Sequence, residues 1–463
     1  MIYKKGLLLP DEPLRKSLVW TNKAILIFAI GEILILGLAG LLASTLYYSA
    51  LENTAAAAIA FIGTAVIFKV FSFVFFSLAS ILIWPLDYLF KQWIIARAKS
   101  RIENLDSKIT IVGIAGSYGK TTMKEVLLEV LGAKFNTAAT PESVNTPVGI
   151  ARWILQKFDE SLQVAIVEMG EHYKGDIKDI CDIAKPDIAV ITGINEAHLE
   201  RMKKMENVEN TIFEIAGAAK PGALIVLNGD DRNVMENYKK FVWPDHKVEK
   251  FSYSNFLFSN FDLNILAWEV ENEVLGKFKI HLLGEYTLGD VDCAGIIAKS
   301  LGASVKEIKQ GIQKIRPVAH RLEPSITPGN ILVIDDAYNG NSDSAREAIK
   351  VLARFKDRRK IYITPGLVET GSASHKVHMD IGRQLAGVAD VVILIRNSVT
   401  EYIELGVRNN ESPAPSGAGQ AGMRQKPEII WFKTAGEAHA ALPEILKPND
   451  VILFQNDWGD QYT

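Results

Sequence analysis

The distribution of hydrophobic and polar residues divides the chain into an apolar first part and a longer, mixed second part. Two long runs, Ala24–Ala50 and Ala55–Phe90, are almost wholly apolar. A helix needs roughly 20 apolar residues to cross the hydrocarbon core of a bilayer. The pattern therefore predicts two transmembrane helices, at about residues 24–46 and 61–84, with a buried hydrophobic hairpin in a soluble protein as the alternative. A cleaved signal peptide fits poorly, because the first run is too long and a second run follows it closely.

The charges that flank these runs predict how the chain is oriented. Glu52 is the one charge in the short segment between the runs, whereas basic residues gather outside them, at Lys4, Lys5, Arg15, Lys16, Lys23, Lys91, Arg97, Lys99 and Arg101. Because positive residues favour the cytoplasmic side of a membrane, both termini and everything after residue 90 are expected to face the cytoplasm. The basic, amphipathic stretch 86–103 is expected to form a juxtamembrane helix at the interface.

Glu32 lies inside the first apolar run and Lys69 inside the second, with Asp87 near the end of the second run. Charged side chains are costly inside lipid. They can pair between the two helices or across protomers, or each can extend to the membrane surface. The sequence leaves these alternatives open.

From Lys108 onward, short apolar runs alternate with stretches of helical periodicity, which is typical of an α/β fold with a mainly parallel sheet. Residues 247–283 instead alternate polar and apolar positions between turn residues, which predicts antiparallel strands. Residues 408–426 are rich in Gly, Pro, Ser and Ala and predict a surface loop. We therefore expect a membrane anchor over 1–105, a central phosphate-loop domain over 106–318 and a Rossmann-like C-terminal α/β domain over 319–463.

Charge and cysteine content exclude two classes of function. The formal net charge is −3 over 463 residues, so nothing indicates binding to nucleic acid. Two cysteines, Cys181 and Cys293, are too few for a disulfide framework and are expected to be reduced thiols.

A candidate phosphate-binding loop follows the first strand of the mixed part, in the stretch ITIVGIAGSYGKTTMKE. Its glycines let successive backbone N–H groups point at one anion, and the helix that follows adds its positive N-terminal end. Lys120 can reach the β- and γ-phosphates of ATP, and the Thr121 hydroxyl can bind Mg²⁺. Ile114 stands where the strict phosphate-loop pattern has its first glycine. The residues assigned to the nucleotide are Gly116, Ser117, Tyr118, Gly119, Lys120, Thr121 and Thr122.

Further motifs follow in a fixed order: SVNTPVGI (143–150), VEMGEHYKGDI (167–177), INEAHLE (194–200), IVLNGDD (225–231), HRLEP (320–324) and VIDDAYNGNSDS (333–344). Together with GSYGKTTMKE, this series resembles the Mur ligase family, whose shortened loop lacks the first glycine. Lys124–Glu125 is similar to the branch that adds D-alanyl-D-alanine to the muramyl tripeptide. The resemblance covers roughly residues 108–463.

The resemblance also implies the site. It implies Mg²⁺ ligands at Thr121, Glu168 and His198, and catalytic residues at Lys120, Glu168, His198 and Arg321. It implies further contacts to ATP from Asn145, Arg321, Asp335 and Asn339, with Asp335 near the ribose, and Tyr286, in a segment that departs from the family pattern, can still stack on the adenine. Taken alone, Glu168 and His198 are an ordinary strand-end carboxylate and a loop histidine. Carboxylates and an imidazole on loops after parallel strands, beside a phosphate loop, form a Mg·ATP site only as a set.

Several segments depart from the family pattern. Ile212 stands where many Mur ligases have a carbamylated lysine that holds a second metal, and Glu209 or Glu214 are the candidate substitutes. The segment GEYTLGD (284–290) replaces the usual adenine-contacting sequence. TPGLVETG (364–371) and NDWGDQY (456–462) differ where substrate selectivity is expected. The apolar runs take the place of the soluble domain that grips a UDP-sugar.

The resemblance implies an ATP-dependent ligase. ATP converts a carboxylate to an acyl phosphate, and an amine then attacks to give an amide, ADP and phosphate. The expected partners are a cell-wall precursor, either a UDP-linked or a lipid-linked peptide, and an amino acid or dipeptide such as D-alanyl-D-alanine. Because apolar runs replace the UDP-binding domain, we hypothesise an acceptor bound to the membrane. The alternative is a membrane-tethered, ATP-binding scaffold whose ligase activity has decayed.

Overall fold

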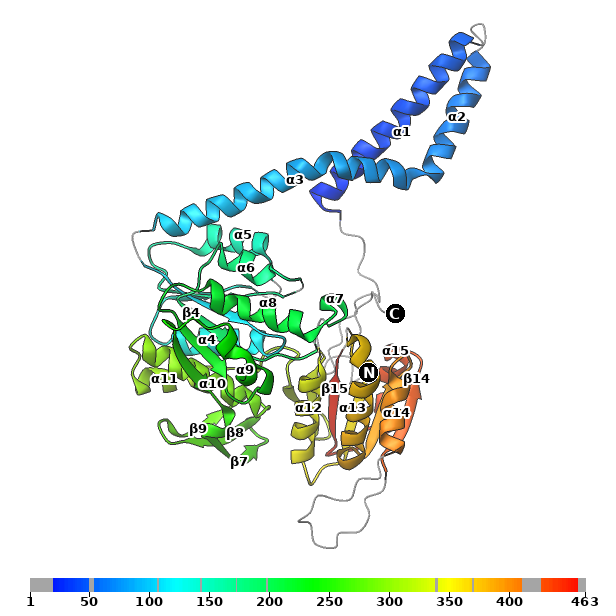
Figure 1. Ribbon diagram of the computed structural model, residues 1–463. Coiled ribbons are helices and arrows are strands. Elements are labelled where there is room, and N and C mark those ends of the chain that lie inside the picture. Colours follow the sequence, from blue (N-terminus) through cyan, green and yellow to red (C-terminus); the bar gives the residue numbers. More distant parts are fainter. Residues whose placement is uncertain are drawn as a thin grey trace. The chain divides into compact units, whose positions relative to one another are not determined.

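The computed structural model describes residues 20–49, 54–105, 108–141, 144–171, 173–196, 199–337, 340–368, 370–409 and 426–456. The chain divides into two compact units near Ala98. One unit runs from Leu9 to Arg97, and the other contains almost all remaining residues. In Figure 1 the first unit consists of the long blue helices, and the second contains the sheets and their covering helices.

Three helices make up the first unit: α1 (Asn22–Ser49), α2 (Thr54–Val70) and α3 (Ser72–Glu103), the last of which continues past Arg97. Helix α1 packs along α2, and many large apolar side chains on all three helices are exposed. The segment Asn22–Thr45 of α1 and the whole of α3 are long and apolar enough to cross a membrane, by length and composition. The apolar pattern therefore forms helices, as the sequence predicts.

The helix boundaries differ from the prediction in the second apolar run. A single helix over 61–84 was expected, but α2 ends before Phe71 and α3 begins after it. Phe71 N–H still donates to Ile67 O at 3.1 Å, which closes the last turn of α2. The apolar sequence continues on both sides of this turn, so hydrophobicity alone gives no sign of it. The predicted helix over 86–103 is the second half of α3, which continues through Pro85.

Ion pairs join the helices of the first unit. Lys69 Nζ on α2 donates to Glu32 Oε1 on α1, so pairing within one chain is the alternative that the structure contains. Asp87 Oδ2 on α3 lies 2.8 Å from Lys23 Nζ on α1 and 2.9 Å from Lys91 Nζ. These five charges are thus held in one pair and one cluster.

The second unit begins with a six-stranded sheet in the order β2-β3-β1-β4-β5-β6, and every neighbouring pair is parallel. Its strands are β1 (Thr110–Ala115), β2 (Thr137–Ala139), β3 (Val164–Glu168), β4 (Ile188–Ile191), β5 (Leu224–Asn228) and β6 (Lys247–Phe251). All five residues of β3 and all four of β4 are buried. A parallel sheet buried on both faces reads as continuous apolar runs rather than as an alternation, which is the pattern in the sequence.

Helices cover both faces of this sheet. Val112 and Ile114 of β1 share a core with Met123 and Leu127 of α4, whereas a side chain at Gly113 would meet Ile215 of α8 at 3.0 Å. Helices α10 and α11 pack on α4, and α6 packs on α8. The helices of this part are α4 (Lys120–Leu131), α5 (Pro147–Lys157), α6 (Asp176–Cys181), α7 (Leu199–Met202), α8 (Met205–Ala218), α9 (Arg232–Asn237), α10 (Tyr286–Ser300) and α11 (Val305–Ile312).

The antiparallel prediction for 247–283 is right for three strands and wrong for the first. Strands β7 (Phe256–Asp262), β8 (Ala267–Asn272) and β9 (Gly276–Ile280) form an antiparallel sheet of their own. Lys247–Phe251, however, is β6 and lies parallel to β5 at the edge of the large sheet. Three of its first four residues are charged and all four are exposed, so its alternation reflects an open edge rather than a hairpin.

A second six-stranded sheet follows in the order β10-β11-β15-β12-β13-β14. Only β10 pairs antiparallel, with β11, and the other neighbours are parallel. The strands are β10 (Glu323–Thr327), β11 (Ile331–Asp336), β12 (Lys360–Thr364), β13 (Val391–Ile395), β14 (Glu428–Phe432) and β15 (Val451–Gln455). The α/β fold class predicted from the alternating pattern is confirmed in both large sheets.

Successive residues of β11 face opposite layers of this part. Leu332 and Ile334 join the core that includes Ile349 of α12, whereas Ile331 and Val333 pack with Leu442 of α15. The helices are α12 (Ser342–Arg354), α13 (Ser374–Val388), α14 (Thr400–Arg408) and α15 (Ala435–Ile445). Figure 1 shows α12, α13 and α14 side by side over one face of the sheet.

Candidate active site

The candidate phosphate loop connects β1 to α4, as predicted, and two of its glycines have backbone angles that other residues rarely adopt. Gly116 has φ = +147° and Gly119 has φ = +78°. A Cβ atom at Gly116 would also clash with Thr192 Oγ1 and lie 3.0 Å from the backbone of Gly193. Glycine avoids both costs because it has no Cβ. The tight turn therefore requires these residues, and α4 begins directly after it at Lys120.

The end of β4 holds this loop in place. Ser117 N–H donates to Gly193 O at 2.8 Å, and Thr192 Oγ1 donates to the carbonyl oxygen of Tyr118. Tyr118 lies against Gly193, where any side chain would clash with its ring. The Tyr118 hydroxyl donates to Asp231 Oδ2 at 2.6 Å. Burial and the Asp231 charge raise the pKa of Tyr118, so it remains a neutral hydrogen-bond donor.

Lys120 lies within the loop and is paired with a carboxylate. Its Nζ is 2.7 Å from Glu171 Oε1 and also donates to the carbonyl oxygen of Gly116. Glu171 is 2% exposed, and its Oε2 has no hydrogen-bond partner among the described residues. Burial raises the pKa of Glu171, whereas the charge of Lys120 lowers it. The motif pattern predicts a role for Lys120 but none for Glu171.

The two predicted metal ligands that the structure describes lie side by side. Glu168 ends β3 and is 7% exposed, and Thr121 Oγ1 donates to Glu168 Oε1 at 3.3 Å. Lys124 Nζ is 3.1 Å from Glu168 Oε2, and the Lys124 side chain is 2% exposed. A hydroxyl beside a carboxylate is the oxygen donor set that Mg²⁺ prefers. The residues therefore fit this ion, and Lys124 is a buried cation that sequence reasoning had used only as a family marker.

Asn145 reaches the same edge of the sheet. Its carbonyl oxygen accepts a hydrogen bond from Gly170 N–H at 3.0 Å. A Cβ at Gly170 would lie 3.0 Å from Asn145 Cγ and 3.2 Å from Nδ2, so the amide packs on this glycine. Asn145 therefore sits beside the loop that carries Glu168 and Glu171.

Two further predicted residues, Tyr286 and Arg321, influence each other electrostatically. Tyr286 begins α10, and its pKa is raised by burial and by the charges of Asp336 and Asp290, while Arg321 lowers it. Thr287 and Asp290 are buried in α10, and Thr287 Oγ1 donates to Gly284 O at 2.5 Å. Tyr286 and Arg321 thus lie close enough to interact electrostatically. Tyr286 begins α10, whereas Arg321 lies just before β10.

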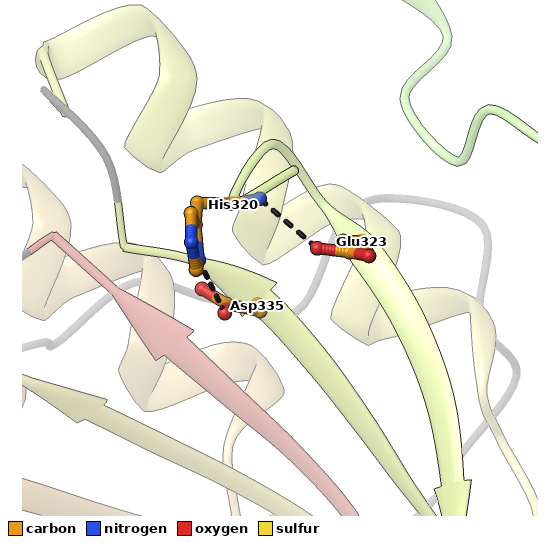
Figure 2. Close-up of side chains that lie close together, drawn as sticks. All are labelled: His320, Glu323 and Asp335. Carbon is orange, nitrogen blue, oxygen red and sulfur yellow. Dashed lines mark hydrogen bonds and ion pairs between the residues drawn. The ribbon is translucent and has the colours of Figure 1, made fainter. Parts of the chain in front are cut away.

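Asp335 is held by a histidine (Figure 2). Its Oδ2 lies 2.8 Å from His320 Nδ1, and its Oδ1 accepts from Ala337 N–H at 3.0 Å. His320 N–H donates to Glu323 Oε2 at 3.1 Å, and His320 has φ = +58°. One ligand atom from each of His320, Glu323 and Asp335 lies within 4.8 Å of the others. The predicted ribose contact is therefore fixed at the end of β11 by two hydrogen bonds.

Asp336, the next residue, points to the buried side. It is 2% exposed, and burial raises its pKa to about 7, although Arg321 and the N–H of Leu322 favour the charged form. Leu322 N–H donates to Asp336 Oδ1 at 3.2 Å. Sequence reasoning had treated this residue only as part of a motif.

Asn195 links the two large sheets. Its Nδ2 donates to Asp343 Oδ2 at 2.7 Å and to Asn341 Oδ1 at 3.1 Å. Asn341 caps the N-terminus of α12. The residue lies in the motif INEAHLE, but only its histidine had been assigned. His198 and Asn339 themselves lie outside the residues that the structure describes.

The candidate substitutes for the missing lysine are accounted for in part. Ile212 is fully buried in the core beneath α8. The Glu214 carboxylate accepts hydrogen bonds from Gly175 N–H at 2.9 Å and Lys178 N–H at 3.1 Å, so it caps the start of α6. Glu209 is half-buried on α8. Ile212 has no ligand atom, and both carboxylate oxygens of Glu214 already accept hydrogen bonds from the start of α6.

Comparisons with known proteins agree with this geometry. Residues 114–296 match the Mur ligase middle domain, and residues 320–455 match the Mur ligase, glutamate ligase domain. The UDP-N-acetylmuramoyl-tripeptide--D-alanyl-D-alanine ligase of Buchnera aphidicola is 32% identical over 283 residues, 60% of this chain and 62% of that enzyme. The chain thus spans about three fifths of the length of that relative.

Two more relatives extend the comparison. The ligase of the same name from Mycobacterium bovis is 27% identical over 365 residues, which are 74% of this chain and 70% of that one. The solved structure of MurF ligase from Thermotoga maritima in complex with ADP has a TM-score of 0.67 at 23% identity, covering 80% of this chain and 81% of that chain. At this identity the structural likeness establishes the fold.

Proposed function

Because residues 114–296 and 320–455 both match Mur ligase domains, the chain belongs to the Mur ligase family, and we propose that it is an ATP-dependent carboxylate–amine ligase. The observation that carries the proposal is the phosphate loop, with Lys120 in the turn and Thr121 against Glu168. The curated relatives are named for joining D-alanyl-D-alanine to a UDP-N-acetylmuramoyl-tripeptide. The same class of acceptor peptide and dipeptide is the first substrate pair to test.

Each residue of the loop then has a task in the reaction. The turn at Gly116–Gly119 and the N-terminus of α4 bind the phosphates through backbone N–H groups. Lys120 stabilises the negative charge on the phosphoryl oxygens as the carboxylate attacks. Thr121 and Glu168, with His198 as the third proposed ligand, would hold Mg²⁺, which supplies further charge neutralisation when it is bound.

The C-terminal part, proposed to begin at about residue 319, supplies the rest of the nucleotide site. Arg321 and Asp335, with Asn339, are proposed to bind the nucleotide from this side, and Tyr286 to contact the adenine. Asn145 is proposed to contact ATP from beside the loop that follows β3. Holding the reactants close together and correctly oriented removes much of the entropic cost of the reaction.

We also propose that residues 1–105 anchor the enzyme to the cytoplasmic membrane. Helix α1 would cross the bilayer and the chain would return through α2 and the start of α3. The Lys23–Asp87–Lys91 cluster supports this arrangement, because it gathers charge at one end of α1 and charges prefer the membrane surface. With the N-terminus proposed to face the cytoplasm, an even number of crossings leaves the catalytic domains on the same side.

The anchor motivates a finer hypothesis, that the acceptor is a lipid-linked peptide. The measurement is turnover of protein reconstituted in vesicles, with UDP-linked and lipid-linked acceptors compared at equal concentration. A variant lacking residues 1–97 that uses the UDP-linked acceptor as fast as the full chain, together with no turnover of lipid-linked acceptors, would exclude the hypothesis.

One observation favours a second function, an ATP-binding scaffold without ligase activity. Ile212 is apolar and fully buried where a metal-holding lysine is expected. ADP release on adding acceptor and amine pairs separates the two functions. The ligase requires ADP release that depends on both substrates, whereas ATP binding without turnover across a broad panel favours the scaffold.

A further inference from the structure

Glu171 is a buried carboxylate at the edge of the phosphate loop with an incomplete set of partners. It is 2% exposed and follows β3 by three residues. Its Oε1 is bound by Lys120 Nζ at 2.7 Å, and its Oε2 is buried without a hydrogen-bond partner in the part of the chain that the structure describes. A buried carboxylate oxygen without a partner is unfavourable, so this group is suited to receive a cation.

The charges around the loop cancel before any nucleotide binds. Lys120 is paired with Glu171, and Lys124 is paired with Glu168 at 3.1 Å. Two ammonium groups and two carboxylates therefore leave no net positive charge to receive a triphosphate. A polyanion that enters such a site needs additional cations with it.

Lys120 cannot remain the full counter-charge of Glu171 once phosphates arrive. Its ammonium already donates to Glu171 and to the carbonyl oxygen of Gly116, and a phosphoryl group competes for the same charge. Glu171 would then be a buried carboxylate that has lost its partner, which is strongly unfavourable. Either a proton or a metal ion must compensate, and carboxylate oxygens are good ligands for hard divalent cations.

Other carboxylates near the site are already engaged. Glu214 caps α6 through two backbone N–H groups, and Glu168, beside Thr121, is already proposed as a Mg²⁺ ligand. Within the described residues, Glu171 Oε2 is the carboxylate oxygen beside the loop that is buried without a hydrogen bond.

We infer that Glu171 is a ligand of a divalent cation that enters with the nucleotide, and that this cation replaces Lys120 as the counter-charge of the carboxylate. The inference rests on the proposed function, because it requires nucleotide at the loop. It assigns Glu171, rather than Glu209 or Glu214, as the additional carboxylate ligand of the site.

The test counts bound Mn²⁺ by electron paramagnetic resonance on the full-length protein in detergent micelles, with and without the non-hydrolysable analogue adenylyl imidodiphosphate. In the presence of the analogue, Glu171→Gln should bind one Mn²⁺ fewer than the wild type, or bind it at least about tenfold more weakly. Without the analogue the two proteins should bind Mn²⁺ alike, because Lys120 then holds the carboxylate.

The matched control is Glu214→Gln, a glutamate of the same domain that caps a helix. It should lower thermal stability while leaving the Mn²⁺ count with the analogue unchanged. Equal counts in Glu171→Gln and wild type would overturn the inference and assign the compensation to a proton, because glutamine mimics the protonated acid. Loss of Mn²⁺ in Glu171→Gln without the analogue would also overturn it. If the wild type gains no Mn²⁺ with the analogue, the proposed function itself fails.

Discussion

The two six-stranded sheets have similar strand arrangements but very different groups at the carboxyl ends of their strands. In the first sheet these ends carry buried charges in pairs, Lys120 with Glu171 and Lys124 with Glu168. In the second sheet, neutral groups lie in the middle of β12, at Tyr362, and at or just after the end of β15, at Gln455 and Asn456. Tyr362 hydroxyl donates to Gln455 Oε1 at 3.1 Å, and Asn456 Nδ2 donates to Gly366 O at 2.6 Å.

The difference separates two uses of one architecture. Ligands of open α/β sheets generally bind outside the carboxyl ends of the strands, so position alone does not decide which sheet binds a triphosphate. Paired charges that can exchange partners suit a site that changes its charge, whereas bonded amides hold loops in one arrangement. The first sheet is therefore proposed to bind the phosphates, and the second to supply a rigid wall for the nucleoside.

The largest expected effect comes from the lysine of the first sheet. Lys120→Ala should lower ligation by about 100- to 1,000-fold, because a positive charge aimed at the phosphoryl oxygens is lost. Lys360→Ala is the matched change in the second sheet, where the side chain donates to the carbonyl of Arg358 at 3.0 Å. It should lower stability and leave nucleotide affinity unchanged. The measurement is steady-state ADP release together with nucleotide titration, and near-normal turnover of Lys120→Ala would remove the loop assignment.

The next effect concerns the carboxylates of the two sheets. Glu168→Gln should weaken the response to Mg²⁺ by about 10- to 100-fold, because one ligand is lost. Asp335→Asn, at the end of β11, should raise the KM for ATP and leave the Mg²⁺ titration unchanged. The Mg²⁺ response of each variant is measured as turnover against Mg²⁺ at saturating ATP. The KM for ATP is measured as turnover against ATP at saturating Mg²⁺. An unchanged Mg²⁺ response in Glu168→Gln would contradict its place in the metal site.

Glycines at positive φ offer a third contrast. Gly116→Ala and Gly366→Ala should each lower the free energy of unfolding by roughly 1–3 kcal/mol, because both residues have φ between +80° and +150°. A Cβ at Gly366 would meet Val399 Cγ2 at 2.7 Å. Only Gly116→Ala should also lose nucleotide binding. Thermal melts with and without ATP separate the two effects. An equal rise in melting temperature with ATP in both variants would contradict the special role of Gly116 in nucleotide binding.

The smallest expected effect is a pH dependence in the second sheet. Burial raises the pKa of Asp336 to about 7, while an unfolded aspartate titrates near 3.8. Between these values the folded state binds the proton and the unfolded state does not, so stability falls as the pH rises. The contribution amounts to about 1 kcal/mol between pH 5 and pH 6.

Asp336→Asn should remove that contribution, and the difference between its unfolding free energy and that of the wild type should change across this range. Denaturant melts at several pH values give the two curves. Parallel curves would mean that Asp336 does not titrate in this window. Arg321 favours the charged form, so Arg321→Gln should move the dependence to higher pH.

The sequence predicts the backbone of the first site well because its constraints are local. Gly116, Gly119 and the start of α4 follow from glycine conformations and a strand-to-helix pattern, and both the α/β fold class and the family are confirmed. The site residues stay predictions, although the structure brings Thr121 and Glu168 together. His198 and Asn339 lie outside the described residues.

The contacts that sequence reasoning missed depend on distant parts of the chain. Glu171 and Lys120 are 51 positions apart, and no periodicity indicates that they pair. Lys124 looks like a surface residue of an amphipathic helix until the end of β3 is placed beside it. The predictions of a single helix through Phe71 and of an antiparallel first strand over 247–251 are wrong for a related reason. Apolar content and alternation do not specify which strand or helix is the neighbour.

The pair between Lys120 and Glu171 also has a consequence for the order of binding. A divalent cation at Glu171 frees Lys120 for phosphate, and phosphate at Lys120 frees Glu171 for the cation. By thermodynamic linkage each partner must then strengthen the binding of the other by the same factor, and typical couplings of this kind are about 5- to 150-fold. Metal and nucleotide would therefore bind cooperatively, and an excess of either one alone would leave the closed ion pair largely intact.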